Sequence, residues 1–283
     1  MTEEWFTETL HPAVAQRLRM ERVVFRDRTE HQDLVIFENG SFGRVLALDG
    51  VVQTTTGDEF IYHEMLAHVP ILAHGRAERV LIIGGGDGGM LRRCLMHPGV
   101  RKVTMVEIDR SVVDLCREHL PAISDGAFVD PRTDLVIADG CRFVKETDER
   151  YDVVIVDSTD PIGPGAVLFT PEFYADCKRC MTAGGVFVNQ NGVPSLDTGE
   201  QRRTYAKLKG LFADVWAYGA PVPTYYGGLM TFGWATDDMA LRRTPVDELQ
   251  RRFAASGLET RWYTPELHAA GFAVPRPVLE LLE

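Results

Sequence analysis

Four short apolar runs in this 283-residue chain each lead into an acidic residue or an acidic loop, at Asp87, Glu107, Asp139 and Asp157. Runs of this kind, rich in β-branched residues, are typical of parallel strands that are buried on both faces. In an open parallel sheet the ligand crevice lies outside the carboxyl ends of the strands. We therefore expect these carboxylates to converge on one acidic site, which favours a cationic ligand.

The loop after the first run is glycine-rich and contains Asp87. Its glycines match the GxGxxG pattern and are Gly84, Gly85, Gly86, Gly88 and Gly89. In a dinucleotide site such glycines let the backbone approach a pyrophosphate, which a fixed carboxylate would repel. The loop therefore favours a nucleoside with a positive charge nearby, and an NAD-dependent enzyme is the weakest alternative.

The other strand-end residues suggest how a nucleoside would be bound. Glu107 stands where a carboxylate commonly binds ribose hydroxyls. Asp139, followed by Gly140, either accepts from an exocyclic adenine amine or caps the next helix, and we favour adenine. The segment from Asp157 through Ser158, Thr159 and Asp160 to Gly165 is rich in proline and glycine and predicts a loop with two carboxylates at its base.

Seven strands are expected in the sheet that positions these residues. Five are buried parallel strands and two follow late in the chain, at 80–83, 103–106, 135–138, 153–156, 186–188, 215–219 and 229–235. A small antiparallel sheet of strands 33–38, 42–48 and 51–56 is predicted upstream by the Asn-Gly and Asp-Gly turns between them. A capping box at Thr56 and Glu59 predicts a helix that stops near Pro70. We divide the chain into an N-terminal β domain, residues 1–58, and a catalytic α/β domain, residues 59–283.

Composition excludes several classes of function. The formal net charge of −11 argues against sequence-independent nucleic-acid binding. The acidic start and the lack of a long apolar run indicate neither a secretory signal nor a membrane anchor, so we expect a cytoplasmic protein. Five cysteines, an odd number, agree with a reducing compartment. The Cys177-x-x-Cys180 pair lacks a second pair for zinc and is interpreted as structural, and no metal site is expected.

Several motifs together resemble those of the polyamine aminopropyltransferases. They are Ile83-Gly-Gly-Gly-Asp-Gly-Gly89, Val106-Glu-Ile-Asp109, Asp157-Ser-Thr-Asp-Pro161 and Pro223-Thr-Tyr-Tyr-Gly227. Shorter stretches also fit, namely His31-Gln32-Asp33, Leu48-Asp49-Gly50, Asp58-Glu-Phe-Ile-Tyr-His-Glu64 and Phe272-Ala-Val-Pro275. The resemblance covers nearly the whole chain, and separated motifs in the right order are far more specific than any one of them.

The resemblance implies a reaction and a fold. Decarboxylated S-adenosylmethionine would donate its aminopropyl group to putrescine, giving spermidine and 5'-methylthioadenosine. The donor is a co-substrate, so no cofactor is implied. The expected fold is a Rossmann-like, methyltransferase-type, mostly parallel seven-stranded sheet preceded by the small β domain. A homodimer is also implied.

The resemblance assigns roles to individual residues. Glu107 would bind the ribose; Asp139, Gly140 and Pro164 the adenine; and Gln32 and His63 would line the donor site, where Asp87 would bind the terminal ammonium. The acceptor side would be lined by Tyr62, Asp157, Asp160 and Tyr225, with Asp157 as the catalytic base and residues 157–169 as a lid. One departure is Arg93, where the family usually has glutamate; we expect a lost or re-formed surface ion pair there.

The chemistry of the reaction agrees with these roles. Intact S-adenosylmethionine carries a carboxylate that the decarboxylated donor lacks, and Asp87 would repel it by roughly 4 kcal/mol at about 4 Å and an effective dielectric near 20. An alkylamine with a pKa of about 10 is protonated at neutral pH, so the acceptor needs a base. The alternatives are an amine N-methyltransferase that uses intact S-adenosylmethionine, an aminopropyltransferase for cadaverine, agmatine or spermidine, and a non-catalytic polyamine or nucleoside sensor.

Overall fold

The computed structural model describes residues 4–159 and 163–283, with only the backbone described for Thr9, Gly163 and Pro164. The predicted site residue Asp160 and the side chain of Pro164 therefore lie outside the described part, as does the middle of the predicted lid. Within the described ranges, no helix is both long enough and apolar enough to cross a membrane.

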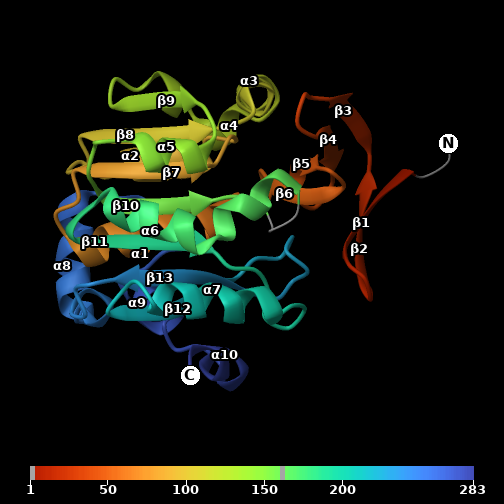
Figure 1. Cartoon of the computed structure of the whole chain (residues 1–283). Helices are drawn as coiled ribbons and strands as arrows, with labels where there is room; N and C mark the ends of the chain where they lie inside the picture. The colour runs from red at the N-terminus through yellow and green to blue at the C-terminus, as the bar shows by residue number, and fades with distance from the viewer. Residues whose placement is uncertain (1–3, 160–162) are drawn as a thin grey trace.

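The centre of the molecule is a seven-stranded sheet (Figure 1). Its order is β12-β13-β11-β10-β7-β8-β9, and the strands β7 to β11 are parallel to one another, whereas β13 is antiparallel to β11 and β12. The bounds are β7 Arg79–Gly84, β8 Lys102–Glu107, β9 Thr133–Ile137, β10 Tyr151–Asp157, β11 Met181–Gln190, β12 Asp214–Pro221 and β13 Leu229–Thr236. All seven strands and the predicted mostly parallel sheet are confirmed.

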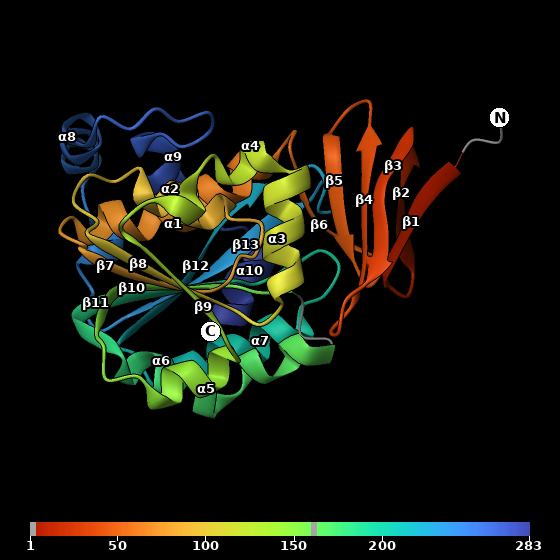
Figure 2. The same cartoon turned by 90° about the horizontal axis from the view of Figure 1, so that it is seen from above.

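Helices cover both faces of this sheet (Figure 2). One face packs against α1 (Glu59–His74), α2 (Gly89–Leu95), α8 (Val246–Ser256) and α9 (Pro265–Gly271), and the other against α5 (Gly140–Glu146), α6 (Pro171–Arg179), α7 (Gly199–Lys209) and α10 (Arg276–Leu282). The remaining helices are α3 (Arg110–His119), α4 (Pro121–Ser124) and three short 3₁₀ turns at 127–129, 163–169 and 241–243. Val80 and Ile82 of β7 belong to the first core, and Leu81 and Ile83 to the second. This alternation explains why the strand is apolar throughout.

Two smaller antiparallel sheets precede the large one. The hairpin of β1 (Glu4–His11) and β2 (Val14–Met20) is followed by the sheet β3 (Arg22–Arg28), β4 (Asp33–Asn39), β5 (Gly43–Leu48) and β6 (Val51–Thr55). The predicted strands β4, β5 and β6 are confirmed, and Asp49 and Gly50 both have positive φ, as their tight turn requires. The first three strands were not predicted.

The predicted boundaries of helix α1 are wrong at both ends. Thr56 Oγ1 accepts from the Arg44 N–H at 3.0 Å instead of capping the helix, and the N-cap residue is Asp58. At the other end the helix includes Pro70 and continues to His74. A proline removes one backbone hydrogen bond. Here the next turn of the helix is buried in the core, and that burial outweighs the loss.

The cysteines carry no disulfide in the structure. All five are free, and Cys177 and Cys180 are buried at the end of α6, where the Cys180 thiol lies 3.2 Å from the carbonyl oxygen of Cys177. Burial raises the pKa of both thiols. The pair therefore packs as small apolar side chains would.

Candidate active site

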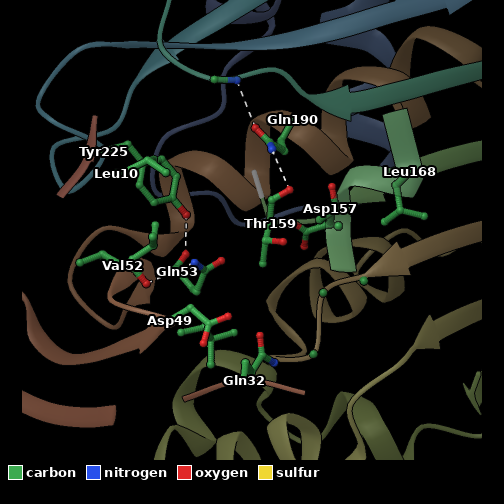
Figure 3. A pocket seen from close by; sticks show the side chains of 18 of the residues that line it. Leu10, Gln32, Asp49, Val52, Gln53, Asp157, Thr159, Leu168, Gln190 and Tyr225 are labelled. Atoms are coloured by element: carbon green, nitrogen blue, oxygen red, sulfur yellow. Dashed lines mark hydrogen bonds between the residues drawn. The ribbon is translucent and has the colours of Figure 1, made fainter. Parts of the chain in front are cut away.

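A cavity of about 750 Å³ lies at the carboxyl ends of the parallel strands, between the large sheet and the N-terminal sheets (Figure 3). It brings together most of the residues that the sequence singled out, namely Gln32, Tyr62, His63, Gly84, Gly85, Gly86, Asp87, Glu107, Asp139, Gly140, Asp157, Ser158, Thr159 and Tyr225. Gly88 and Gly89 lie behind the wall, where α2 begins. The four strand-end carboxylates do share one site.

Two of the loop glycines are required by close contacts. A Cβ on Gly84, whose φ is 87°, would lie 2.1 Å from the carbonyl oxygen of Asp157, and a Cβ on Gly89 would lie 2.2 Å from the ring of His63. Gly84, at the end of β7, therefore packs directly against the end of β10. The Gly85 N–H also donates to the Asp157 carbonyl there, at 3.0 Å. The glycine loop therefore sets the spacing between Asp157, His63 and the start of α2.

Asp157 ends strand β10, and its side chain lines the cavity. The Tyr62 hydroxyl donates to Asp157 Oδ1 at 2.7 Å. Desolvation raises the pKa of this carboxyl from 3.8 to about 6, with a further upward effect from Asp87 and opposing effects from His63 and the Tyr62 hydrogen bond. The group is therefore mainly a carboxylate at neutral pH, yet its affinity for a proton is far above that of an ordinary aspartate.

Asp87 faces a buried histidine. Asp87 Oδ1 accepts from the Gly89 N–H at 2.8 Å, and Asp87 Oδ2 lies 3.6 Å from His63 Nε2, while His63 Nδ1 is 2.8 Å from Glu59 Oε2. Burial by itself lowers the pKa of His63, but Asp87 and Glu59 outweigh it and raise this pKa from 6.5 to about 9. His63 is therefore an imidazolium at neutral pH, set between two carboxylates.

Arg93 extends this row of alternating charges into the core. Its Nη2 donates to Glu59 Oε1 at 2.9 Å and its Nη1 lies 3.8 Å from Glu64 Oε1, and the side chain is only 4% exposed. The expectation of a surface ion pair at Arg93 was wrong. Arg93 lies four residues after Gly89 on α2, so both residues face α1.

Glu64 anchors the inner end of the row. It is fully buried and accepts backbone N–H bonds from three consecutive residues, Arg261, Trp262 and Tyr263. These hydrogen bonds satisfy the oxygens of a buried side chain. The network consequently ties α1, α2 and the segment before α9 to the wall of the cavity.

Glu107 and Asp139 lie on the other side of the cavity. Burial raises the pKa of Glu107 from 4.5 to about 7, although the Asp109 N–H donates to its Oε1 at 2.9 Å. Gln32 Nε2 donates to the Asp109 carboxylate at 3.2 Å, which holds Gln32 beside this wall. Asp139 Oδ1 caps helix α5 by accepting from the N–H groups of Cys141 and Arg142. The helix-cap alternative for Asp139 is thus observed, and its second oxygen remains available to a ligand.

Tyr225 enters the cavity from the segment between β12 and β13. Its hydroxyl donates to the carbonyl of Gln53 on β6 at 2.5 Å (Figure 3). Thr224 donates twice to Asp58, the residue that precedes α1. This segment is therefore fixed against both the N-terminal sheets and the helix that carries Tyr62 and His63.

Sequence reasoning missed several lining residues. Gln190 could have been found, because it ends the fifth parallel strand, and the carboxylates end or closely follow the other four. Glu8 and Gln53 come from the N-terminal sheets, and Gln201 from α7. No local pattern marks these three, because only the tertiary fold brings them to the cavity.

Comparisons with known proteins agree with this geometry. Residues 59–245 match the family model of the spermine/spermidine synthase domain, and residues 4–56 match that of the spermidine synthase tetramerisation domain. The chain is 57% identical to polyamine aminopropyltransferase 1 of Pseudomonas aeruginosa over 98% of this chain and 97% of that protein. It is 56% identical to polyamine aminopropyltransferase of Serratia proteamaculans over 99% of this chain and 97% of that protein.

Solved structures give the same result. A crystal structure of spermidine synthase in complex with the transition-state analogue AdoDATO matches with a TM-score of 0.92 at 37% identity, covering 99% of this chain and 94% of that chain. Spermidine synthase from Thermotoga maritima matches with a TM-score of 0.89 at 35% identity and the same coverage. The chain therefore belongs to the spermine/spermidine synthase family of polyamine aminopropyltransferases.

Proposed function

We propose that this enzyme is a spermidine synthase, which transfers the aminopropyl group of decarboxylated S-adenosylmethionine to putrescine. The observation that carries the proposal is the pairing of Asp157 with Tyr62 in an acidic cavity beside a glycine loop suited to a nucleoside. The names of the similar proteins support the same reaction class.

The donor would lie along the ends of β7, β8 and β9. Glu107 would accept from the ribose hydroxyls, while Asp139 and Gly140 would contact the adenine together with Pro164. Gln32 would help to enclose the nucleoside. The donor's ammonium would bind Asp87, which places the sulfonium and the adjacent carbon between the glycine loop and Asp157.

In the proposed reaction, putrescine attacks this carbon in line with the breaking bond. The amine lone pair forms the new C–N bond, and the C–S bond breaks with its electron pair passing to sulfur, which releases 5'-methylthioadenosine. Asp157 first binds the acceptor as an ammonium and then takes its proton. A pKa of about 6 supports this role, because the group is ionised at neutral pH and yet accepts a proton more readily than an ordinary aspartate. Tyr62 and Tyr225, with Asp160, would hold the nitrogen in line.

In this proposal Asp87 selects the donor by charge, and His63 limits how strong that selection is. Asp87 repels the carboxylate of intact S-adenosylmethionine, but the His63 imidazolium at 3.6 Å weakens that repulsion. About half of the roughly 4 kcal/mol for two bare charges would still disfavour the intact molecule roughly thirtyfold.

A steady-state comparison of four acceptors tests the choice of putrescine. With decarboxylated S-adenosylmethionine as donor, we expect kcat/KM to be highest for putrescine among putrescine, cadaverine, agmatine and spermidine. If kcat/KM is higher for one of the other three amines, that amine is the preferred acceptor. If no 5'-methylthioadenosine forms with any of the four amines, the proposed reaction is wrong.

We further propose that the enzyme is a cytoplasmic oligomer. Five free cysteines, four of them buried, support a reducing compartment such as the cytoplasm. A match to a model described as a tetramerisation domain supports assembly, and the family resemblance implies a homodimer. Light scattering of the purified protein distinguishes a dimer from a tetramer.

A further inference from the structure

His63 lies where the buried row of alternating charges meets the cavity. Its Nδ1 is 2.8 Å from Glu59 Oε2, and its Nε2 is 3.6 Å from Asp87 Oδ2. A Cβ on Gly89 would lie 2.2 Å from the ring, so α2 leaves the imidazole little room to move. Tyr62 packs edge-on against the ring, with the centroids 5.4 Å apart. The ring is therefore held in one orientation.

Glu59 determines which nitrogen of His63 keeps a proton. Burial by itself raises the pKa of Glu59, but the hydrogen bond and charge of His63 and the charge of Arg93 outweigh burial and lower this pKa. An ionised carboxylate can only accept a hydrogen bond, so Nδ1 carries the proton in this contact. Nε2 is consequently the ring nitrogen that can lose one.

The donor's ammonium needs the same oxygen that His63 Nε2 faces. Asp87 Oδ1 already accepts from the Gly89 N–H at 2.8 Å, whereas Oδ2 faces the imidazolium. The inference drawn here rests on the proposed function, which places the donor's ammonium at Asp87. An ammonium at Oδ2 is a second cation beside His63, and a nearby like charge disfavours the charged form of the ring.

The groups around His63 support the loss of its proton when the donor binds. Burial lowers the pKa of the ring, whereas Asp87, Glu59 and Asp157 raise it. Arg93 Nη2 pairs with Glu59 Oε1 at 2.9 Å and compensates part of that carboxylate's charge. When the donor's ammonium pairs with Asp87, another of the favourable charges is compensated, while the burial remains.

We propose that Glu59 is a positioning residue of the donor site, and that donor binding expels the Nε2 proton of His63 into the solvent. Glu59 keeps the proton on Nδ1, and the bare Nε2 accepts a hydrogen bond from the donor's ammonium. His63 thus changes from a cation to a hydrogen-bond acceptor. The affinity for the donor consequently increases with pH and levels off above the pKa of His63 in the free enzyme.

Calorimetric titration of the full-length enzyme, in buffers of different ionisation enthalpy, counts the protons released on binding. Decarboxylated S-adenosylmethionine is compared at pH 8 with 5'-methylthioadenosine, which lacks the ammonium, so that protons from Glu107 in the nucleoside site cancel. The donor should release about one proton more, because His63, with a pKa of about 9, is charged before binding. Between pH 7.5 and 8.5 the donor's Kd should fall up to about tenfold relative to that of 5'-methylthioadenosine.

Two matched variants test the role of Glu59. Glu59→Gln keeps an oxygen that accepts from Nδ1 but removes the charge, so His63 should be neutral at pH 8 and the extra proton should disappear. Arg93 still has Glu64 as a partner in this variant. Glu78→Gln removes an exposed carboxylate instead and should release the same extra proton as the wild-type enzyme.

Equal proton release with the two ligands in the wild-type enzyme would overturn the inference, as would an extra proton that persists in Glu59→Gln. If Glu59→Gln does not fold, nitrogen NMR of the imidazole rings in the wild-type enzyme decides, with His63→Gln used to assign the signals. The bound state should show Nδ1 protonated and Nε2 bare, and two protonated nitrogens would contradict the inference. These results are distinct from failure of the proposed function, in which the wild-type enzyme releases no 5'-methylthioadenosine with any amine.

Discussion

At the scale of single residues, Asp157 differs from Asp87 in its partners. Tyr62 holds one of its oxygens and no arginine or lysine pairs with it among the described residues, whereas Asp87 faces the His63 cation. The lack of an arginine or lysine partner suits Asp157 to the proposed role of base. This difference leads to two predictions.

Replacing Asp157 by Asn should leave donor binding nearly unchanged while kcat falls roughly 10²- to 10⁴-fold, because the amide keeps the shape but cannot take a proton. Single-turnover kinetics with putrescine, together with the Kd of the donor, would measure both. Near-wild-type turnover would show that Asp157 is not the base.

The pH profile should show the proton affinity of Asp157. Its pKa is raised to about 6, so kcat/KM for putrescine should fall as the pH decreases through about 6, where Asp157 becomes protonated and could no longer act as the proposed base. The donor is kept saturating, because Glu107, whose pKa is about 7, lies in the proposed nucleoside site and would be covered there. The fall in kcat should occur at lower pH than the fall in kcat/KM. The ammonium group of a bound acceptor would stabilise the charged form of Asp157 and so lower its pKa. A flat profile down to pH 5 would contradict this assignment.

At the scale of elements, Arg93 joins three segments. It reaches from α2 to Glu59 and Glu64 on α1, and Glu64 binds the backbone before α9. Removing one partner from a buried ionic network leaves uncompensated charge in the core. We therefore expect the packing of α1, α2 and the segment before α9 to depend on Arg93.

Arg93→Met should lower the free energy of unfolding by roughly 3–5 kcal/mol, whereas Arg92→Met should lower it by about 0–1 kcal/mol, because Arg92 pairs with the exposed Asp125. Urea unfolding of both variants measures the difference. Equal effects of the two substitutions would mean that the buried network contributes little.

The sequence predicts the elements whose pattern is dictated by burial on two faces. β10 is one example: Val153 to Val156 are all buried, so the run is apolar throughout. By contrast, β3 has no fully buried residue, and β2 has only Leu18 and Met20, so neither shows a burial pattern in the sequence. The carboxylates at the strand ends were predictable because parallel strands end at one edge. The contacts of Arg93 were not, because they depend on how separate helices pack.

At the scale of the whole molecule, the cavity is built by both the N-terminal sheets and the large sheet. Glu8 of β1 accepts from Gln16 Nε2 and from the Val52 N–H, each at 2.9 Å, and Gln16 also donates to the carbonyl of Thr224 at 2.7 Å. The N-terminal hairpin thus holds the segment that carries Tyr225. The division into residues 1–58 and 59–283 stays a prediction, and the site needs residues from both.

The most direct measurement identifies the products from two donors offered separately with putrescine. With decarboxylated S-adenosylmethionine, we predict 5'-methylthioadenosine and spermidine in equal amounts, measured by mass spectrometry. With intact S-adenosylmethionine we predict a kcat/KM lower by roughly thirtyfold or more, and no S-adenosylhomocysteine. S-adenosylhomocysteine together with a methylated amine, or no 5'-methylthioadenosine from the decarboxylated donor, would contradict the account.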